Sequence, residues 1–475
     1  MRYITKTDLL IVAANSGAVM IGIGIMCLIP LIFDFIFLEF DVISFLAPAA
    51  ISITLGFLLR DYFGKMDEKK IRLKHGMIIS SYAWLWASLI GGLTIALATN
   101  IPIIDGVLES MSALTGTGIT IFSNVEILPY SILFFRAFEQ WIGGLGVVIM
   151  VISVLSKPGS VSSKLFESEG GERIKPSVKT TLEKTIKIYV IYSVAGFVLY
   201  VLAGMPLFDS LCNTFTIIST GGMSVKNANI GFYHDDMIYF ISMILMILGA
   251  TSFLVHYKVI KSKGRSIIND LQFKIIITVI ACVTVMLYFI SNIVPMELLF
   301  TVVSAITTTG ASITPAQTMA GWPSFALICI MCLMLTGGSS GSTVGAIKLE
   351  RMIIFFKGIY RHIREILSPE GRVVVVKLNG HKLNEKTIAQ AGNFITLYMM
   401  IIMFTWAIYC LYGYDPFYSL FTAISLQGNN GLDLGIISNT LDPVLKIVSM
   451  FSMWVGRLEI YPVLITLRTG FEIFK

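Results

Sequence analysis

Charged residues and cysteines are scarce in this chain. Only 13% of its 475 residues are charged, 55% are hydrophobic, and the mean hydropathy is +0.81. This composition excludes a soluble globular domain. The six cysteines all lie in apolar segments, so disulfide bonds are not expected: Cys27, Cys212, Cys282, Cys329, Cys332 and Cys410. The Cys329-x-x-Cys332 pair lacks a nearby histidine or further cysteine, which disfavours a zinc site.

Histidine and acidic residues are also rare within the apolar runs. We place all five histidines in or near loops: His75, His234, His256, His362 and His381. An alternating-access symporter needs buried acidic or histidine relays, so this scarcity disfavours one. A membrane enzyme needs a nucleophile–base pair or a metal cluster, and the sequence contains no such pattern.

Long apolar runs dominate the chain. About twenty apolar residues cross a bilayer core of roughly 30 Å. We predict ten spans, at 9–37, 42–60, 77–99, 129–156, 184–204, 236–257, 271–293, 323–356, 393–413 and 441–467. The first run is too long for a signal-peptide core.

Basic residues cluster at 60–74, 157–187, 258–274 and 348–386. With the N-terminus inside, ten crossings place all four clusters on one face, which the positive-inside rule makes cytoplasmic. The C-terminus then lies inside as well. The net charge of +6 therefore reflects membrane orientation rather than nucleic-acid binding.

A helix, a short polar-tipped segment and a second helix recur four times. The short segments, at 104–117, 207–219, 296–308 and 415–427, are too brief to cross a membrane, so we predict re-entrant pore helices. The predicted fold is an all-α membrane protein with four tandem helix–pore-helix–helix units around a pseudo-fourfold pore. Its parts are an N-terminal helix pair (1–76), unit 1 (77–156), a cytoplasmic linker (157–183), unit 2 (184–260), unit 3 (270–356), a second linker (357–392) and unit 4 (393–475).

The four short segments begin alike, with a proline beside an acidic residue. The pairs are Pro102 and Asp105, Pro206 and Asp209, Pro295 and Glu297, and Asp415 and Pro416. Proline suits a first helical turn, and a carboxylate there accepts from free N–H groups. Each helix would then direct its negative C-terminal end inward.

A glycine follows each short segment. We match Gly118, Gly221, Gly310 and Gly431, spaced 221−118 = 103, 310−221 = 89 and 431−310 = 121 residues apart. Carbonyl oxygens from four such loops can replace the water around a monovalent cation. The predicted ion-binding residues are Gly116, Thr117, Gly118, Ser219, Thr220, Gly221, Thr308, Thr309, Gly310, Asn429, Asn430 and Gly431. No ring of carboxylates is present to hold Ca²⁺ or Mg²⁺. A single shared glycine predicts a short filter.

Glycine and hydroxyl residues interrupt the span 323–356. We predict an intramembrane gating loop at 336–347 that includes Gly337, Gly338, Ser339, Gly341 and Gly345. A nucleotide-binding P-loop is rejected because no Gly-Lys-Ser/Thr follows and no strand precedes it.

Two arginines lie within the apolar runs. A charge there usually faces a cavity and has a partner. We predict that Arg457 faces the pore and meets the 336–347 loop, where its positive charge would oppose an ion leaving the filter. Lys348 would add to this electrostatic barrier. The alternative is an Arg457 side chain that snorkels to an interface. Glu459 is a poor partner for Arg457, whereas Glu139 at i+3 is a candidate partner for Arg136.

These motifs together resemble the Trk/Ktr/HKT superfamily of potassium transporters over almost the whole chain. The resemblance rests on the four units, Gln140–Gly146, the glycine-rich loop running into Ile347-Lys348, and Gly456-Arg457-Leu458-Glu459. The extra N-terminal helix pair is similar to the Trk branch. The resemblance implies a homodimer in the cell membrane that takes up K⁺, gated by the loop and Arg457. It also implies a cytoplasmic nucleotide-binding regulatory partner, and no organic cofactor in this chain.

Two positions depart from the family pattern. Gly116 stands where threonine is usual, and the fourth loop reads Gly431-Leu432-Asp433 instead of Gly-Pro-Gly. Asp433 near the outer mouth is a candidate for attracting cations. In the plant branch, serine in place of the first filter glycine accompanies sodium preference, so Gly118 favours potassium. A Na⁺-permeable or Na⁺-coupled transporter and a broken-helix solute symporter stay as alternatives.

Overall fold

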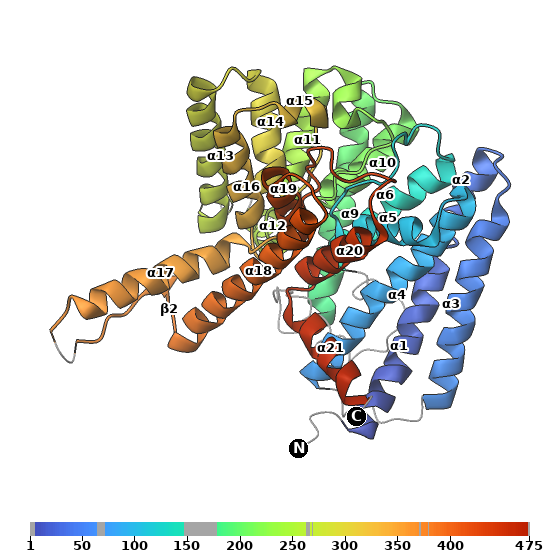
Figure 1. Cartoon of the computed structure of the whole chain (residues 1–475), viewed down its shortest axis with the longest axis horizontal. Coiled ribbons are helices and arrows are strands. Elements are labelled where there is room, and N and C mark those ends of the chain that lie inside the picture. Colours follow the sequence, from blue (N-terminus) through green and yellow to red (C-terminus); the bar gives the residue numbers. More distant parts are fainter. Residues whose placement is uncertain are drawn as a thin grey trace.

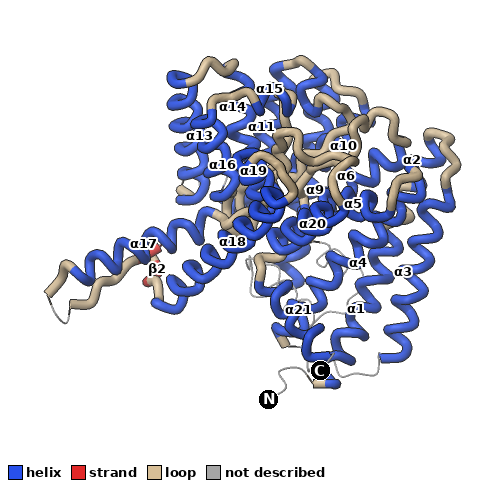
Figure 2. Tube along the Cα trace, in the orientation of Figure 1, coloured by secondary structure: helices blue, strands red, loops and turns tan. Residues whose placement is uncertain are grey.

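The computed structural model describes residues 5–63, 72–146, 178–262, 267, 269–369, 372–378 and 380–473. These residues are mostly helical (Figure 2). The N-terminal region comprises α1 (Lys6–Met26), α2 (Leu31–Ile36) and α3 (Val42–Phe63). Figure 1 shows α1 and α3 beside α4 at one side of the molecule.

Four repeats of a long helix, a short helix and a second helix follow. Unit 1 holds α4 (Leu73–Thr99), α5 (Ile103–Thr115) and α6 (Tyr130–Leu145); unit 2 holds α9 (Val178–Leu202), α10 (Leu207–Ile218), the 3-10 helix η2 (Asn229–Tyr233), α11 (Asp236–Gly249) and α12 (Phe253–Ser262). Unit 3 holds α13 (Leu271–Ile290), α14 (Pro295–Ile306), α15 (Ala316–Ala320), α16 (Ser324–Thr336) and α17 (Leu349–Ile366). Unit 4 holds α18 (Glu385–Leu411), α19 (Pro416–Gln427), α20 (Pro443–Arg457) and α21 (Tyr461–Ile473). The predicted repeat of long helix, pore helix and second helix is confirmed.

Two of the ten predicted spans, 236–257 and 441–467, are bent helix pairs and not single straight helices. Among the described residues, six helices are long and apolar enough to cross a membrane, or up to eight if each of two bent pairs is one span. The pair α11 and α12 bends by 101°, and the pair α20 and α21 by 119°. Hydropathy does not detect these bends because both halves of each pair are apolar. The part of the predicted span 129–156 beyond Gly146 lies outside the described residues.

The second helix of each unit ends after a similar length, at Leu145, Gly249, Thr336 and Arg457. The interruption is longer in unit 3 than in units 2 and 4, because twelve residues (348−336 = 12) separate α16 from α17. The predicted break inside 323–356 is therefore present.

An arm projects from the helical body (Figure 1). It consists of α17, the first half of α18, and a two-stranded hairpin of β1 (Lys377–Leu378) and β2 (His381–Lys382). The arm has a small core of its own, formed by Ile354, Val376, Leu378, Leu383 and Ala391. The predicted linker 357–392 is thus largely ordered in secondary structure.

Glycines let the helices around the first pore helix approach closely. A Cβ at Gly92 on α4 would meet the Val107 backbone of α5 at 2.6 Å. A Cβ at Gly143 on α6 would collide with the Leu114 carbonyl oxygen of α5. Small residues allow such close contact between membrane helices. The prediction that the 143–146 glycines permit close approach is confirmed at Gly143.

Replacing Gly143 by alanine is expected to push α6 away from α5. Overpacking of this kind costs about 1–3 kcal/mol, so the apparent Tm of the purified protein should fall. Gly392→Ala is the matched control, because Gly392 lies in helix α18 and a Cβ there meets nothing within 4 Å. An unchanged Tm for Gly143→Ala would contradict the close packing.

Candidate functional site

All four short helices end in the same backbone arrangement. An N–H donates to the carbonyl five residues earlier, from Thr117 to Ser112 (2.9 Å), Gly221 to Thr216 (2.8 Å), Thr309 to Ser304 (3.0 Å) and Asn430 to Ser425 (2.9 Å). The residue just before each donor is left-handed: Gly116 (φ 70°), Thr220 (54°), Thr308 (50°) and Asn429 (49°). This is a Schellman ending, which turns the chain sharply after a helix. Four helix C-termini, each with negative dipole, therefore end at these loops.

The four loops close into a ring. One left-handed glycine in each loop packs against a carbonyl of the next loop: Gly118 against Gly221, Gly222 against Thr309, Gly310 against Asn430, and Gly431 against Thr117. A Cβ at any of these glycines would collide with that carbonyl oxygen. The contacts run from unit 1 through units 2, 3 and 4 and back to unit 1. The loops therefore surround one centre, in the middle of the helices (Figure 2).

The glycine matching in unit 2 is wrong by one residue. Gly222, with φ 71°, occupies the position of Gly118, Gly310 and Gly431, and Gly221 occupies that of Thr117. The correct spacings are 222−118 = 104 and 310−222 = 88. The start of each helix carries the missing signal, since 118−105, 222−209 and 310−297 all equal 13.

Side chains join neighbouring loops. Asn429 Nδ2 donates to Thr117 Oγ1 (3.0 Å), and Asn430 Nδ2 donates to the Ala305 carbonyl (2.9 Å). Gln140 of α6 holds the second loop through Gly221 O (2.7 Å) and Met223 N (3.1 Å). Gln140 lies on α6 of unit 1, so it braces the loop of the neighbouring unit.

The expected capping by acidic residues occurs in unit 4 only. There Asp415 accepts from Phe417 N (2.9 Å) and Tyr418 N (3.0 Å). Asp105 instead pairs with Lys446 of α20 at 2.6 Å, and Asp209 accepts from the Tyr233 hydroxyl at 2.9 Å. Helix α14 has no side-chain cap. Asp433, two residues after Gly431 in the fourth loop, accepts a hydrogen bond from Gly435 N (2.9 Å).

The segment between α16 and α17 packs against three of the four left-handed residues. Thr343 Oγ1 lies 3.0 Å from Thr220 Oγ1, and Gly345 N donates to Thr308 Oγ1 (3.1 Å). A Cβ at Gly345 would meet Asn429 Cβ at 2.9 Å. This segment therefore lies directly below the ring, on the side where the helix C-termini end.

The same segment is anchored to the bend between α11 and α12. Ser339 N donates to Ala250 O (3.0 Å), and Phe253 N donates to Gly341 O (3.0 Å). Gly337 and Gly341 are left-handed at φ 68° and 70°, and a Cβ at Gly338 would meet Ala250 O at 2.9 Å. The sequence-predicted loop residues thus lie together.

Arg457 links this segment to α6. Its Nη1 donates to Thr343 O (2.6 Å), and its Nη2 donates to the carbonyls of Gly143 and Gly144 at the end of α6. The guanidinium carbon lies 5.6 Å from the Trp84 ring centroid. Arg457 therefore connects three units around the segment.

Lys348 contacts an acidic residue that sequence reasoning did not assign to it. Lys348 Nζ lies 2.8 Å from Glu459 Oε1, and Arg351 pairs with the other oxygen of the same carboxylate. Lys348 and Glu459 are both left-handed, at φ 73° and 58°. The pair joins the start of α17 to the bend between α20 and α21.

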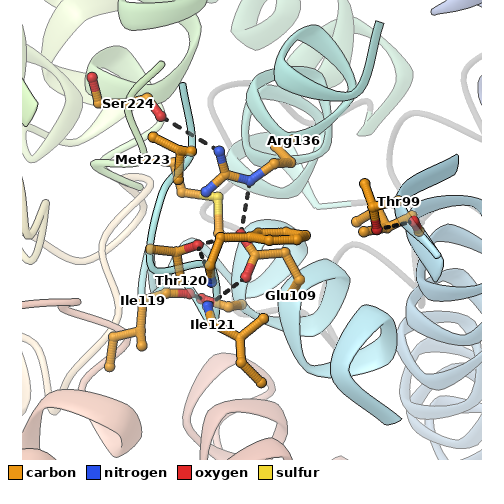
Figure 3. Close-up of polar contacts among 12 residues, drawn as sticks. Thr99, Glu109, Ile119, Thr120, Ile121, Arg136, Met223 and Ser224 are labelled. Atoms are coloured by element: carbon orange, nitrogen blue, oxygen red, sulfur yellow. Dashed lines mark hydrogen bonds and ion pairs between the residues drawn. The ribbon is translucent and has the colours of Figure 1, made fainter. Parts of the chain in front are cut away.

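The predicted pairing of Arg136 with Glu139 is wrong. Arg136 Nε instead donates to Glu109 Oε1 of α5 at 2.7 Å (Figure 3), and Glu139 accepts from Ser110 Oγ at 2.6 Å. The two partners are 27 residues apart (136−109), so no helical spacing reveals them.

Two of the histidines expected in or near loops lie in the first turn of a helix and are buried. His75 is buried in α4 and lies 2.7 Å from Asp8 of α1, and His256 is buried in α12 and contacts Tyr192. His75 Nδ1 accepts from Arg72 N, so Nε2 carries the proton donated to Asp8. The side chain of His381 lies outside the described residues.

The family model for TrkH, described as a cation transport protein, matches residues 44–297 and 293–472. The chain belongs to the TrkH family. An uncharacterized cation transporter of Methanocaldococcus jannaschii is 36% identical, covering 98% of this chain and 97% of that protein. The Trk system potassium uptake protein TrkH of Salmonella typhimurium is 26% identical, covering 86% and 88%.

The TrkH fold is also that of a solved structure. The crystal structure of the potassium transporter TrkH from Vibrio parahaemolyticus matches with a TM-score of 0.85 at 24% identity, covering 98% of this chain and 99% of that one. The TrkH family is one of membrane cation transporters, so this chain is a multi-pass membrane protein. Among the described residues, no group of three or more His, Cys, Asp or Glu side chains forms a metal site. The ring described above consists of backbone carbonyl groups and not of such side chains.

The assignment of Gly222, and not Gly221, as the ring glycine of unit 2 can be tested by the stability of two variants. Gly222→Ala should lower the apparent Tm more than Gly221→Ala, because Gly222 is left-handed and its Cβ would collide with backbone. A strained position of this kind costs about 1–3 kcal/mol. The three atoms nearest to a Gly221 Cβ all belong to the side chain of Gln140. Equal losses, or a larger loss for Gly221→Ala, would contradict the register.

Proposed function

We propose that this chain takes up potassium across the cell membrane through the four-loop ring. The closed set of glycine–carbonyl contacts carries the proposal, because a rigid ring of backbone oxygens can replace an ion's hydration shell. Four helix C-termini add negative potential at the same place. The potassium uptake proteins among the relatives support K⁺ as the transported ion.

The carbonyls at the ring are the proposed ion ligands. They belong to Gly116, Thr117, Gly118, Thr220, Gly221, Gly222, Thr308, Thr309, Gly310, Asn429, Asn430 and Gly431, with Ser219 just before the second loop. Thr117 and Thr309 keep their hydroxyls on neighbouring threonines, Thr115 and Thr307, at 2.8 Å in both units. Their carbonyl oxygens are therefore the groups left for an ion. Membrane potential would drive entry, at about 2.3 kcal/mol per charge per 100 mV.

The segment 336–347 is the proposed gate, with Arg457 as its fastening. Thr343 and Gly345 lie against the ring, so an ion leaving the ring towards this side would meet the segment first. A cavity of about 590 Å³ borders Ser340, Gly341 and Lys348, which gives the segment space to move. Lys348 directly follows the segment, so breaking its ion pair with Glu459 would free the C-terminal end of the segment.

The proposed assembly rests on the family resemblance. The chain would act as a homodimer in the cell membrane, with both termini cytoplasmic and with a nucleotide-binding regulatory subunit on that side. A Na⁺-permeable or Na⁺-coupled transporter is the second candidate, because the ring lining is neutral and the relative with 36% identity is named only as a cation transporter.

Gly310→Ser tests the ring. A side chain at this position displaces the Asn430 carbonyl, so the Rb⁺/Na⁺ uptake ratio in proteoliposomes should fall several-fold. Gly470→Ser is the matched control, since a Cβ at Gly470 meets nothing within 4 Å. An unchanged ratio in a folded Gly310→Ser protein would count against potassium selection by the ring.

Arg457→Ala tests the gate. Loss of the contacts to Thr343, Gly143 and Gly144 should raise Rb⁺ flux several-fold by freeing the segment. Arg457→Lys keeps the charge but has a single donor group, so we expect a smaller increase. Flux equal to wild type in Arg457→Ala would remove the assigned role.

A further inference from the structure

A buried ion pair lies just outside the ring, between the first and second loops. Glu109 is fully buried and Arg136 is 2% exposed. Glu109 Oε1 also accepts from Thr120 Oγ1 (2.8 Å), and Oε2 accepts from Ile121 N (2.8 Å). The Glu109 carboxylate on the pore helix α5 therefore holds Thr120 and Ile121, which follow the ring glycine of the same loop, by two hydrogen bonds.

Arg136 extends this network to the second loop. Its Nη1 donates to Ser224 O at 3.4 Å, and Figure 3 shows the guanidinium between Glu109 and Ser224. Thr120 and Ser224 are equivalent residues, because each lies two positions after its ring glycine (120−118 = 2, 224−222 = 2). The pair thus ties matching points of adjacent loops.

The other three units have a neutral residue at the position of Glu109. Nine residues before each ring glycine lie Glu109, Asn213, Thr301 and Thr422 (118−109, 222−213, 310−301, 431−422). Asn213 bonds to Tyr233 Oη (3.0 Å), and Thr301 bonds back to Glu297 O within its own helix (2.8 Å). The charged brace is therefore a property of the junction between units 1 and 2.

A buried ion pair of this kind is a poor source of stability. Replacing both partners by apolar residues of similar volume is often neutral, whereas removing one partner is costly. Its geometric effect is more specific, because Glu109 supplies the acceptor for a backbone N–H beside the ring. Together with Arg136, these bonds link the first loop to the second.

We propose that Glu109 and Arg136 are positioning residues for cation selection, which act by setting the width of the ring between units 1 and 2. They do not touch the ion. This inference rests on the proposed function of the ring. Loosening the brace would let the ring contract around a smaller cation, so Na⁺ would compete better.

The test is Rb⁺ uptake into proteoliposomes with Na⁺ as competitor, using the full chain. Glu109→Gln should reduce the Na⁺ concentration for half-inhibition at least five-fold, because a neutral amide oxygen holds Arg136 and Ile121 N more weakly. Arg136→Lys keeps a cation beside Glu109 but cannot bond Ser224 at the same time, so a smaller shift in the same direction is expected.

The variant Glu109→Leu/Arg136→Met separates positioning from stability. It removes both charges of the pair together, so its Tm should fall less than that of Glu109→Gln, which leaves Arg136 without a carboxylate partner. It still lacks the acceptor for Ile121 N, so Na⁺ inhibition should still strengthen. This double variant decides the question if Glu109→Gln fails to fold.

The matched control is Asp105→Leu/Lys446→Met. Asp105 and Lys446 form another buried ion pair, at 2.6 Å, that joins α5 to α20. Its removal should leave Na⁺ inhibition unchanged. Na⁺ inhibition equal to wild type in Glu109→Leu/Arg136→Met, or an equal shift in the control, would overturn the inference. Absence of saturable, K⁺-inhibited Rb⁺ uptake in the wild type would instead refute the proposed function.

Discussion

The site depends on the contact between a glycine without a Cβ and the carbonyl of the next loop. This contact occurs once between each pair of adjacent units and closes a ring of four. It requires a left-handed backbone, which glycine adopts without steric cost. The preceding left-handed residue costs more, since Thr220 and Thr308 are β-branched. Their side chains contact Thr343 and Gly345, so the strained positions are also the ones that the segment 336–347 holds.

The surrounding helices are arranged around this ring. Short helices deliver their C-termini to it, and the second helices stop or bend near it. Polar atoms at the bends find partners in other units, as when Ser339 N bonds to Ala250 O and Arg457 bonds to Gly143 O. Non-helical backbone at membrane depth requires such partners. The backbone groups left free where a helix of one unit is interrupted therefore find hydrogen-bond partners in other units.

Local sequence patterns predicted the unit order, the helix starts and the break before α17, because prolines, glycines and apolar runs report local backbone preference. They failed where the outcome depends on packing. Arg136 bonds to Glu109 on another helix, and the bends of 101° and 119° leave hydropathy unchanged. The one-residue error at Gly221 arose because two glycines are adjacent and both satisfy the motif. The 13-residue distance from the acidic residue resolves it.

The direction of the ring contacts has an evolutionary consequence. The closest contact of each ring glycine is with the repeat that follows it, so a change in one repeat acts directly on the next. A larger residue in one copy would need a matching retreat in the next copy along the chain. Covariation among homologues should accordingly link unlike repeats in one rotational sense, from each repeat to its successor and from the last to the first.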